Sequence, residues 1–200
     1  MIKYGIIGLL SLLLACTLNN SKSESFELSK ESAFVQVSGT SPMHDWKMYL
    51  KTFDCNAEFI MKGSQVKGID KVTFKCKAED LKSDNSLMDN KAYSSLKSGI
   101  FPELKFNMTS PVKISLNNNK FRDKLNGNLF IAGKSIAISI PLNGTLDIKN
   151  GTTTIDVSGE TELKMSDFDI SPPAFLMGAQ KTGDRVSISF SLQFLQKSGQ

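Results

Sequence analysis

Residues 125–142 have the sequence LNGNLFIAGKSIAISIPL, in which apolar side chains alternate with small or polar ones on both sides of a glycine. Alternation with a period of two is typical of β-strands that bury one face. A type II′ hairpin turn prefers glycine first, which predicts a turn at Gly133-Lys134. The stretch therefore predicts an antiparallel hairpin, and its register makes three apolar pairs: Ile131 with Ile136, Leu129 with Ile138, and Leu125 with Leu142.

Two further hairpins pass the same test, that apolar residues oppose apolar residues on one face. The first turns at Asn150-Gly151, a strong type I′ signal, and opposes Leu146 to Ile155 and Ile148 to Thr153. The second precedes it in the chain and pairs Phe53 with Ala78, Cys55 with Cys76, Ala57 with Phe74, and Phe59 with Val72. Successive strands are therefore expected to pair as a meander.

Further strands are predicted at residues 33–40, 46–50, 104–109, 112–116 and 186–194. The apolar parity flips near Lys51-Thr52, which indicates a bulge or a bend. One helix is predicted over residues 89–98, ending before Gly99 and lying across one mouth. About eight strands and one helix favour a closed or nearly closed up-and-down barrel over a sandwich, and a barrel of this size can hold one ligand.

The N-terminus has the pattern of an export signal. Residues 1–15 contain Lys3 followed by an apolar run that is too short to span a bilayer. The run ends in Leu13-Leu14-Ala15-Cys16, which resembles a bacterial lipobox, so we expect residues 1–15 to be removed and Cys16 to be lipidated. Residues 17–25 are small and polar and are expected to form a tether, with one β-barrel domain over residues 26–197.

Composition and motifs argue against most enzyme and nucleic-acid functions. The formal net charge is +4, and basic residues are scattered among acidic ones, so no nucleic-acid partner is expected. His44 is the only histidine, and no spacing typical of a metal site accompanies it. The sequence also has no Gly-x-Ser-x-Gly elbow, Cys-His signature or phosphate-binding glycine motif. We therefore predict no catalytic residues, no metal and no obligatory cofactor.

Three features leave alternatives open. Cys55 and Cys76, if directly opposed, either form a cross-strand disulfide or remain two buried free thiols. His44-Asp45-Trp46 forms a structural turn in which Trp46 seals the barrel end, or it contacts a ligand's polar head. Residues 165–178, rich in Phe and Met with two prolines, form a ligand-covering loop or simply cover the core. Apolar residues of the helix region are expected in the core unless a cavity lies beneath them: Met88, Tyr93, Leu96, Ile100 and Phe101.

Six segments in this order resemble the YceI-like family: residues 39–46 (GTSPMHDW), 88–97, 102–106 (PELKF), 127–133 (GNLFIAG), 163–173 (LKMSDFDISPP) and 181–184 (KTGD). The resemblance spans residues 33–194 and implies a lipocalin-like extended antiparallel barrel of the bacterial periplasm or envelope. In some members the barrel encloses a polyisoprenoid chain. Asp169 stands where the family often has glycine. The resemblance implies no fixed catalytic or binding side chains.

Two functions follow as hypotheses. The first is a non-catalytic envelope lipoprotein that binds a polyisoprenoid, an isoprenoid quinone or a similar lipid in its lumen. The alternative is a structural or stress-related envelope protein with a filled barrel that acts through protein partners. We expect lipid anchoring that faces the periplasm, with the outer membrane favoured over the inner, and a homodimer is compatible with the sequence. The ligand-binding residues inferred from inward parity and the apolar loop are Phe53, Phe59, Phe74, Leu129, Ile138, Phe168, Phe175, Met177 and Phe190.

Overall fold

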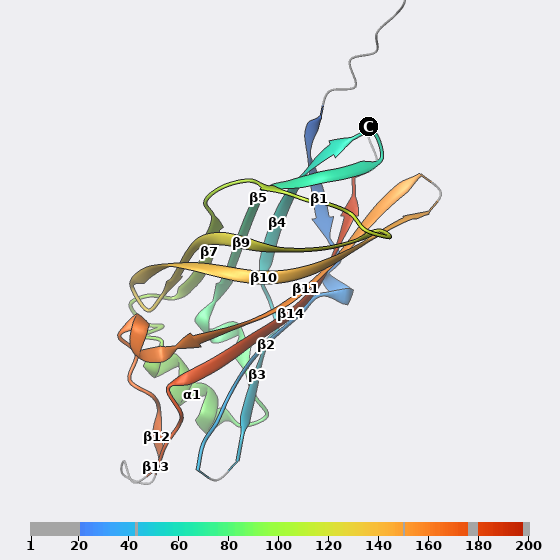
Figure 1. Ribbon diagram of the computed structural model, residues 1–200. Coiled ribbons are helices and arrows are strands. Elements are labelled where there is room, and N and C mark those ends of the chain that lie inside the picture. The colour runs from blue at the N-terminus through green and yellow to red at the C-terminus, as the bar shows by residue number, and fades with distance from the viewer. Residues whose placement is uncertain (1–20, 43, 150, 176–179, 198–200) are drawn as a thin grey trace, which may run out of the picture.

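The computed structural model describes residues 21–42, 44–149, 151–175 and 180–197. The described part is all-β apart from one α-helix and three short 3-10 turns (Figure 1). The long strands are β1 (Lys22–Leu28), β2 (Phe34–Gly39), β3 (Trp46–Leu50), β4 (Asp54–Lys62), β5 (Gln65–Lys77), β7 (Glu103–Met108), β9 (Lys120–Ile131), β10 (Lys134–Lys149), β11 (Thr152–Lys164) and β14 (Arg185–Gln196). The short elements are η1 (Lys30–Ser32), η2 (Ala78–Asp80), β6 (Leu81–Lys82), α1 (Ser86–Ser95), β8 (Val112–Lys113), η3 (Met165–Phe168), β12 (Ala174–Phe175) and β13 (Gln180–Lys181).

The sheet closes on itself as an eight-stranded antiparallel barrel. Strands β4, β5, β7, β9, β10, β11 and β14 pair in that order, and β1 pairs with both β4 and β14. Three strands of the barrel are interrupted: β1 continues into β2 past η1, β3 into β4 past residues 51–53, and β5 into β6 past η2. The break after Leu50 confirms the bend that the parity flip predicted.

The Asn150-Gly151 hairpin has the predicted register, with Leu146 opposite Ile155 and Ile148 opposite Thr153. The hairpin at Gly133 is shifted by two residues. Its turn is Ala132-Gly133, and Leu129 therefore opposes Ile136 instead of Ile138. Both turn residues have positive φ, 51° and 90°, as a type I′ turn requires. The prediction was wrong because a shift of two residues keeps every side chain on the same face, so the apolar pattern cannot detect it.

The predicted register of the β4–β5 hairpin is wrong for a related reason. Cys55 opposes Phe74 and Ala57 opposes Val72, and two further shifts follow along the pair, after Glu58 and after Ile60. The predicted index sum holds only beyond the strand break, where Leu50 of β3 opposes Leu81 of β6. Each bulge or break shifts the strand register by one or two residues, and the alternating pattern alone does not show where a bulge occurs.

The cysteines are consequently not paired. Cys55 and Cys76 are both buried free thiols, and Cys76 pairs in register with Leu104 on the opposite side of β5. Diagonal positions on a strand pair are about 7–8 Å apart, beyond the usual reach of a disulfide. The alternative of two buried thiols acting as small apolar residues is therefore the one the structure supports.

Element boundaries differ modestly from the predicted ones. The helix spans Ser86–Ser95, three residues earlier than expected, and Lys97, two residues past its end, is in the left-handed region (φ 56°) ahead of Gly99. The barrel begins at Lys22, because backbone pairing with β4 recruits Lys22 to Ser25, which the sequence assigned to the tether. The signal segment 1–15 and Cys16 lie outside the described residues.

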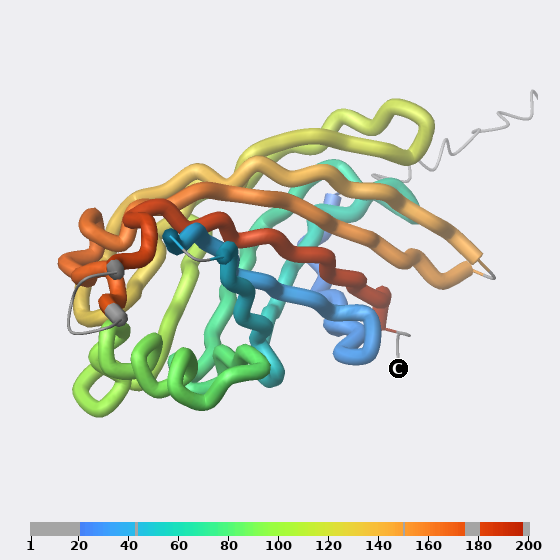
Figure 2. Tube along the Cα trace, turned by 90° about the horizontal axis from the view of Figure 1, so that it is seen from below, coloured from blue at the N-terminus to red at the C-terminus, as the bar shows by residue number. Residues whose placement is uncertain are grey.

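The two ends of the barrel differ. Helix α1, η3 and the β12–β13 pair gather at one end, whereas the first residues of β1 and the C-terminal end of β14 lie at the other (Figures 1 and 2). The terminal end is tightly packed by aromatic rings: Phe59 contacts Phe26 at a centroid distance of 4.9 Å and Phe194 at 5.9 Å. All three are at most 4% exposed, so this end is filled by the protein's own side chains.

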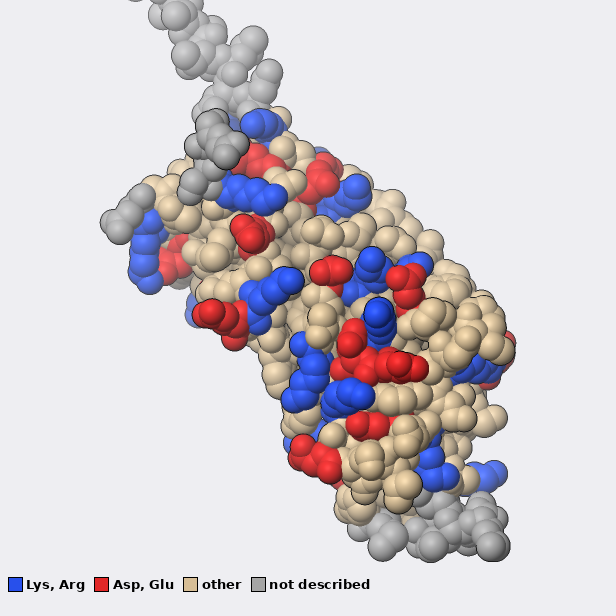
Figure 3. Space-filling model, turned by 180° about the vertical axis from the view of Figure 1, so that it is seen from behind, with Lys and Arg blue, Asp and Glu red and all other residues tan. Residues whose placement is uncertain are grey.

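On the outer surface, Lys and Arg lie beside Asp and Glu over the face seen in Figure 3, with both signs interspersed. The ion pairs among the described residues are exposed, as with Lys71 and Glu58 at 3.8 Å, and such pairs add little stability. Among the described residues, no helix combines the length and apolar character that crossing a bilayer would require.

The barrel wall makes close approaches at inward-facing glycines. A Cβ at Gly127 would lie 2.4 Å from the ring of Phe106 and 2.6 Å from the backbone oxygen of Asn107. We expect Gly127→Ala to lower the free energy of unfolding by about 1–3 kcal/mol, because backbone on the neighbouring strand has to move. Gly99→Ala, which meets no atom within 4 Å, is the control and should change it by less than about 0.5 kcal/mol. Urea denaturation measures both, and equal effects would contradict the close approach.

The thiols predict a pH dependence of stability. Burial raises the pKa of Cys55 and Cys76 from 9.0 to about 12, and the carboxylate of Asp80 adds to the shift at Cys76. The unfolded chain releases these protons first, so the free energy of unfolding should fall as pH rises from about 9 toward 12. The limiting slope is about 1.4 kcal/mol per pH unit for each thiol. Urea denaturation between pH 7 and 11 should show a smaller decline in the Cys55→Ala, Cys76→Ala double variant, and identical declines would refute this origin.

Candidate functional site

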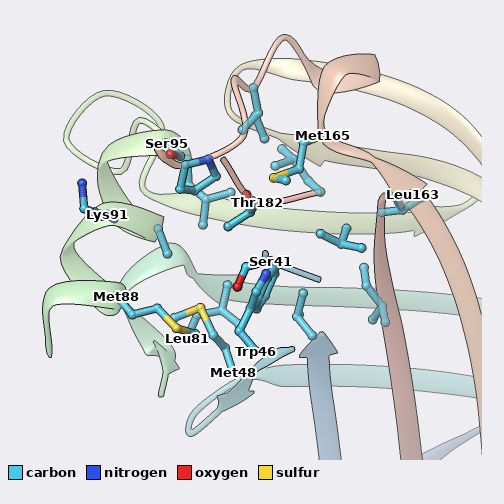
Figure 4. A pocket seen from close by; sticks show the side chains of 18 of the residues that line it. Ser41, Trp46, Met48, Leu81, Met88, Lys91, Ser95, Leu163, Met165 and Thr182 are labelled. Atoms are coloured by element: carbon cyan, nitrogen blue, oxygen red, sulfur yellow. The ribbon is translucent and has the colours of Figure 1, made fainter. Parts of the chain in front are cut away.

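A pocket of about 500 Å³ lies at the helix end of the barrel (Figure 4). Its lining is predominantly apolar, and it comes from barrel strands, α1 and the loops that gather at this end. The lining residues are Val37, Ser41, Pro42, His44, Trp46, Met48, Leu81, Asn85, Met88, Lys91, Ala92, Ser95, Leu96, Leu104, Ile131, Leu163, Lys164, Met165, Phe168, Ile170, Pro173, Thr182, Val186 and Ile188. The volume lies within the range of small-molecule sites, which is about 300–1,000 Å³.

The pocket exists because the sheet is incomplete at this end. Strand β6 ends at Lys82, β7 begins at Glu103, and these two strands do not pair with each other. Helix α1 comes from the chain between them and contacts β6 and η2. Met88, Ala92 and Leu96, at spacings of four residues, lie on one face of the helix and line the pocket. This face forms the wall of the pocket where no strand pairing closes the barrel.

Polar side chains hold this helix in place. The side chain of Asn85 caps it by accepting from the backbone N–H groups of Leu87 and Met88. The carboxylate of Asp89, buried at 8% exposure, accepts from both the backbone N–H and the hydroxyl of Ser83 at 2.7 Å. The hydroxyl of Tyr93 donates to the backbone oxygen of Leu81 at 2.8 Å. These bonds tie α1 to β6, so its apolar face has a defined position over the barrel.

The second wall is the segment after β11. Turn η3 buries Phe168 at 2% exposure, and Asp169 follows with φ 55°, a left-handed conformation that glycine adopts without strain. The backbone N–H and hydroxyl of Ser166 donate to Asp184 at 2.8 and 2.6 Å, and these hydrogen bonds lower the pKa of that carboxyl group. The turn is thereby fastened to the start of β14.

The third wall is the β2–β3 loop. It is the hydroxyl of Ser41 that holds this turn, donating to the backbone oxygen of His44 at 2.6 Å and accepting from its N–H at 3.3 Å. Trp46 opposes Gly39, and its indole ring packs directly on that glycine. A Cβ added to Gly39 would lie only 2.4 Å from the nearest ring atom. His44 and Trp46 both line the pocket at this end of the barrel.

Polar atoms are few inside the pocket. The indole Nε1 of Trp46 and the hydroxyl of Thr182 are both buried, and neither has a hydrogen-bond partner among the described residues. Lys91 Nζ donates to the backbone oxygen of Ala174 at 2.9 Å, which ties α1 to β12. The lining contains no Asp or Glu, and within the described residues no cluster of His, Cys, Asp or Glu could hold a metal ion.

The sequence-predicted ligand residues separate into groups. Phe168 lines the pocket. Phe59 belongs to the packed aromatic end, and Leu129 is 9% exposed in the core. Phe53, Phe74, Ile138 and Phe190 are half-buried residues that pack against that core between the two ends. Phe175 lies in β12, but its side chain is outside the described residues, as is Met177.

Sequence reasoning missed most of the pocket. Met88 and Leu96 were expected in the core unless a cavity lay beneath them, and the structure places both on the pocket wall. Met48 and Thr182 were not proposed as ligand contacts, and Trp46 was proposed only as part of His44-Asp45-Trp46, in the alternative that this segment contacts a ligand's polar head. Inward parity was the signal for Met48, Leu104 and Ile188, but parity marks a face of the barrel and does not say at which level the lumen is hollow.

The sequence profile of the YceI-like domain matches residues 19–194. The chain belongs to the YceI-like family. Its six recognised segments include the β2–β3 loop, α1 and the segment after β11, which form the three walls of the pocket. No curated protein matches the chain.

Several solved structures share the barrel fold. BcnA of Burkholderia cenocepacia superimposes with a TM-score of 0.61 at 17% identity, over 84% of this chain and 99% of BcnA. A polyisoprenoid-binding domain from Saccharophagus degradans, implicated in plant cell wall breakdown, gives 0.64 at 11% identity, over 88% and 100%. The YceI protein of Campylobacter jejuni gives 0.59 at 20% identity, over 74% and 84%. At these identities the similarity establishes the fold.

The attachment of α1 can be tested through Asp89. We expect Asp89→Ala to lower the free energy of unfolding by about 1–3 kcal/mol, because the two donor groups of Ser83 lose their acceptor. Asn90→Ala, an exposed neighbour on the same helix, is the control and should have little effect. Chemical denaturation followed by far-UV circular dichroism measures both variants, and a similar loss in each would show that the bond to Ser83 is unimportant.

Proposed function

We propose that the protein is a non-catalytic envelope lipoprotein that binds the apolar chain of a polyisoprenoid, an isoprenoid quinone or a similar lipid inside its barrel. The observation that carries this proposal is the apolar pocket of about 500 Å³ beneath α1. Burial of apolar surface, at about 25 cal/mol per Å², supplies the binding free energy. The polyisoprenoid-binding neighbour from Saccharophagus degradans supports the same ligand class.

The size of the pocket limits what it encloses. At about 30 Å³ for a group the size of a water molecule, 500 Å³ accommodates roughly 17 such groups. A longer chain has to continue past Ile188 toward the half-buried Phe190 and Ile138, which point into the same lumen. It stops at the packed rings of Phe59 and Phe194. In this proposal the predicted lumen residues form the deeper path, and the pocket beneath α1 is the entrance.

The position of the pocket also fits a tethered carrier. The described chain begins in β1 at the end of the barrel opposite α1 (Figure 1). A lipid anchor on Cys16 would therefore hold the packed end toward the membrane and leave the pocket mouth facing the periplasm. That orientation suits the exchange of a ligand with a periplasmic partner.

The packed end favours the alternative function to a limited degree. Phe26, Phe59, Phe194 and Ile155 fill that part of the barrel, as expected for a structural or stress-related envelope protein that acts through protein partners. The apolar pocket has no role in that alternative. Ligand binding therefore remains the preferred function.

Co-purification is the direct test of ligand class. The protein produced in a bacterial envelope is purified gently, weighed by native mass spectrometry, and extracted with organic solvent. We expect a stoichiometric polyprenyl or quinone species. A protein that carries no lipid, and still carries none after incubation with polyprenyl lipids, would favour the filled-barrel alternative.

Substitutions in the pocket locate the binding site. Ile188→Asp places a charge on the barrel wall and Met88→Glu places one on the helix wall, and each should weaken lipid binding at least about tenfold because an unpaired charge is poorly tolerated in an apolar site. Ser191→Asp, an exposed position on the same strand as Ile188, is the control. Fluorescence of Trp46, the single tryptophan, reports binding, and circular dichroism checks folding. Unchanged affinity in both folded pocket variants would exclude this pocket.

A further inference from the structure

Among the residues that the structure describes, two buried polar atoms in the pocket walls have no hydrogen-bond partner: the indole Nε1 of Trp46 and the hydroxyl oxygen of Thr182. A buried donor that makes no hydrogen bond costs about 1–3 kcal/mol, and folded proteins retain few of them. Figure 4 shows both side chains in the pocket wall, on different elements: Trp46 comes from β3 and Thr182 from the segment that precedes β14.

The surrounding contacts hold both groups in place. The Trp46 ring packs on Gly39, where a side chain would collide with it. Thr182 is 9% exposed, and two backbone hydrogen bonds fix its position. Its own N–H donates to the backbone oxygen of Pro173 at 3.0 Å, and the N–H of Gly183 donates to the backbone oxygen of Thr40 at 2.9 Å. These anchors are independent of the two unpartnered atoms. The polar atoms are therefore not needed to build the walls that carry them.

The indole N–H of Trp46 and the hydroxyl of Thr182 determine which ligand groups could form hydrogen bonds with them. An indole N–H only donates, and a threonine hydroxyl both donates and accepts. An uncharged oxygen, as in a ketone, an alcohol or a quinone carbonyl, can accept from both. Two lysines line the pocket: Lys91 donates to the backbone oxygen of Ala174, and Lys164 is exposed and acts on the carboxylate of Asp184. A charged head at the depth of Trp46 and Thr182 would therefore lack compensation.

We propose that Trp46 and Thr182 recognise an uncharged oxygen on the ligand, so that the pocket selects an amphiphile with an oxygen-bearing group over a pure hydrocarbon. This inference rests on the proposed function, since it concerns the same pocket. It adds the class of group that the apolar chain must carry and the two side chains that contact it. Their apolar neighbours, such as Met48 and Ile188, contact the chain itself.

The test compares three probes of equal chain length: decane, 1-decanol and 2-decanone. Calorimetry measures their binding to the wild-type protein and to Trp46→Phe, Thr182→Val and Thr182→Ser. We expect wild type to prefer the alcohol and the ketone over the alkane by about tenfold, the effect of one or two hydrogen bonds. Trp46→Phe and Thr182→Val should each reduce this ratio of affinities by about threefold or more, while Thr182→Ser retains it.

Stability distinguishes recognition from a structural role. Thr182→Val removes a hydroxyl that has no partner, so the melting temperature of the ligand-free protein should stay the same or rise. A lower melting temperature with loss of alkane binding would assign Thr182 a structural role and overturn the inference. Equal affinity of wild type for all three probes, or stronger binding of decanoate than of 1-decanol, would also overturn it while leaving apolar binding intact. Failure of every probe to bind would overturn the proposed function as well.

Discussion

Closure of the sheet is the constraint on which the rest of the structure depends. Strand β1 pairs with β4 along its first residues and with β14 along its last, so the described barrel is joined by backbone hydrogen bonds on both sides of β1. A closed barrel of eight strands has a nearly fixed width. Its interior is then either filled by side chains or left hollow, and the two outcomes occur at opposite ends of this protein.

Filling depends on where large rings meet small residues. On three neighbouring strands, inward glycines leave room for a ring from another strand: Gly127 for Phe106, Gly144 for Phe121, and Gly159 for Phe190. Phe26, Phe59 and Phe194 complete the packing near the chain termini. Toward α1 the residues that line the pocket include Val37, Leu104 and Ile188 on the barrel strands. The hollow therefore lies where the pairing between β6 and β7 is missing and where short side chains face inward.

The loops around the pocket are built by local hydrogen bonds between side chains and backbone. Asn85 and Asp89 position the helix, Ser166 and Asp184 fasten η3, and Ser41 holds the β2–β3 turn. The hydrogen bonds that stabilise these walls do not involve the indole Nε1 of Trp46 or the hydroxyl of Thr182. That separation leaves the polar groups of Trp46 and Thr182 available to a ligand, in an apolar site where one well-placed hydrogen bond discriminates strongly between ligands.

The sequence by itself determined the β-class, the approximate ends of most strands, the single helix near one mouth and the family, because alternation and turn residues are local properties of the chain. It placed the Asn150-Gly151 hairpin in its true register, since that turn admits two residues and no bulge precedes it. Only the tertiary structure decided the registers around Ala132-Gly133 and Cys55, because a shift of two residues preserves every face. It also decided which inward side chains meet and which leave a cavity. Phe59 and Ile188 have the same inward parity, yet one lies in packed core and the other lines the pocket, because contact across a barrel depends on residues far apart in the chain.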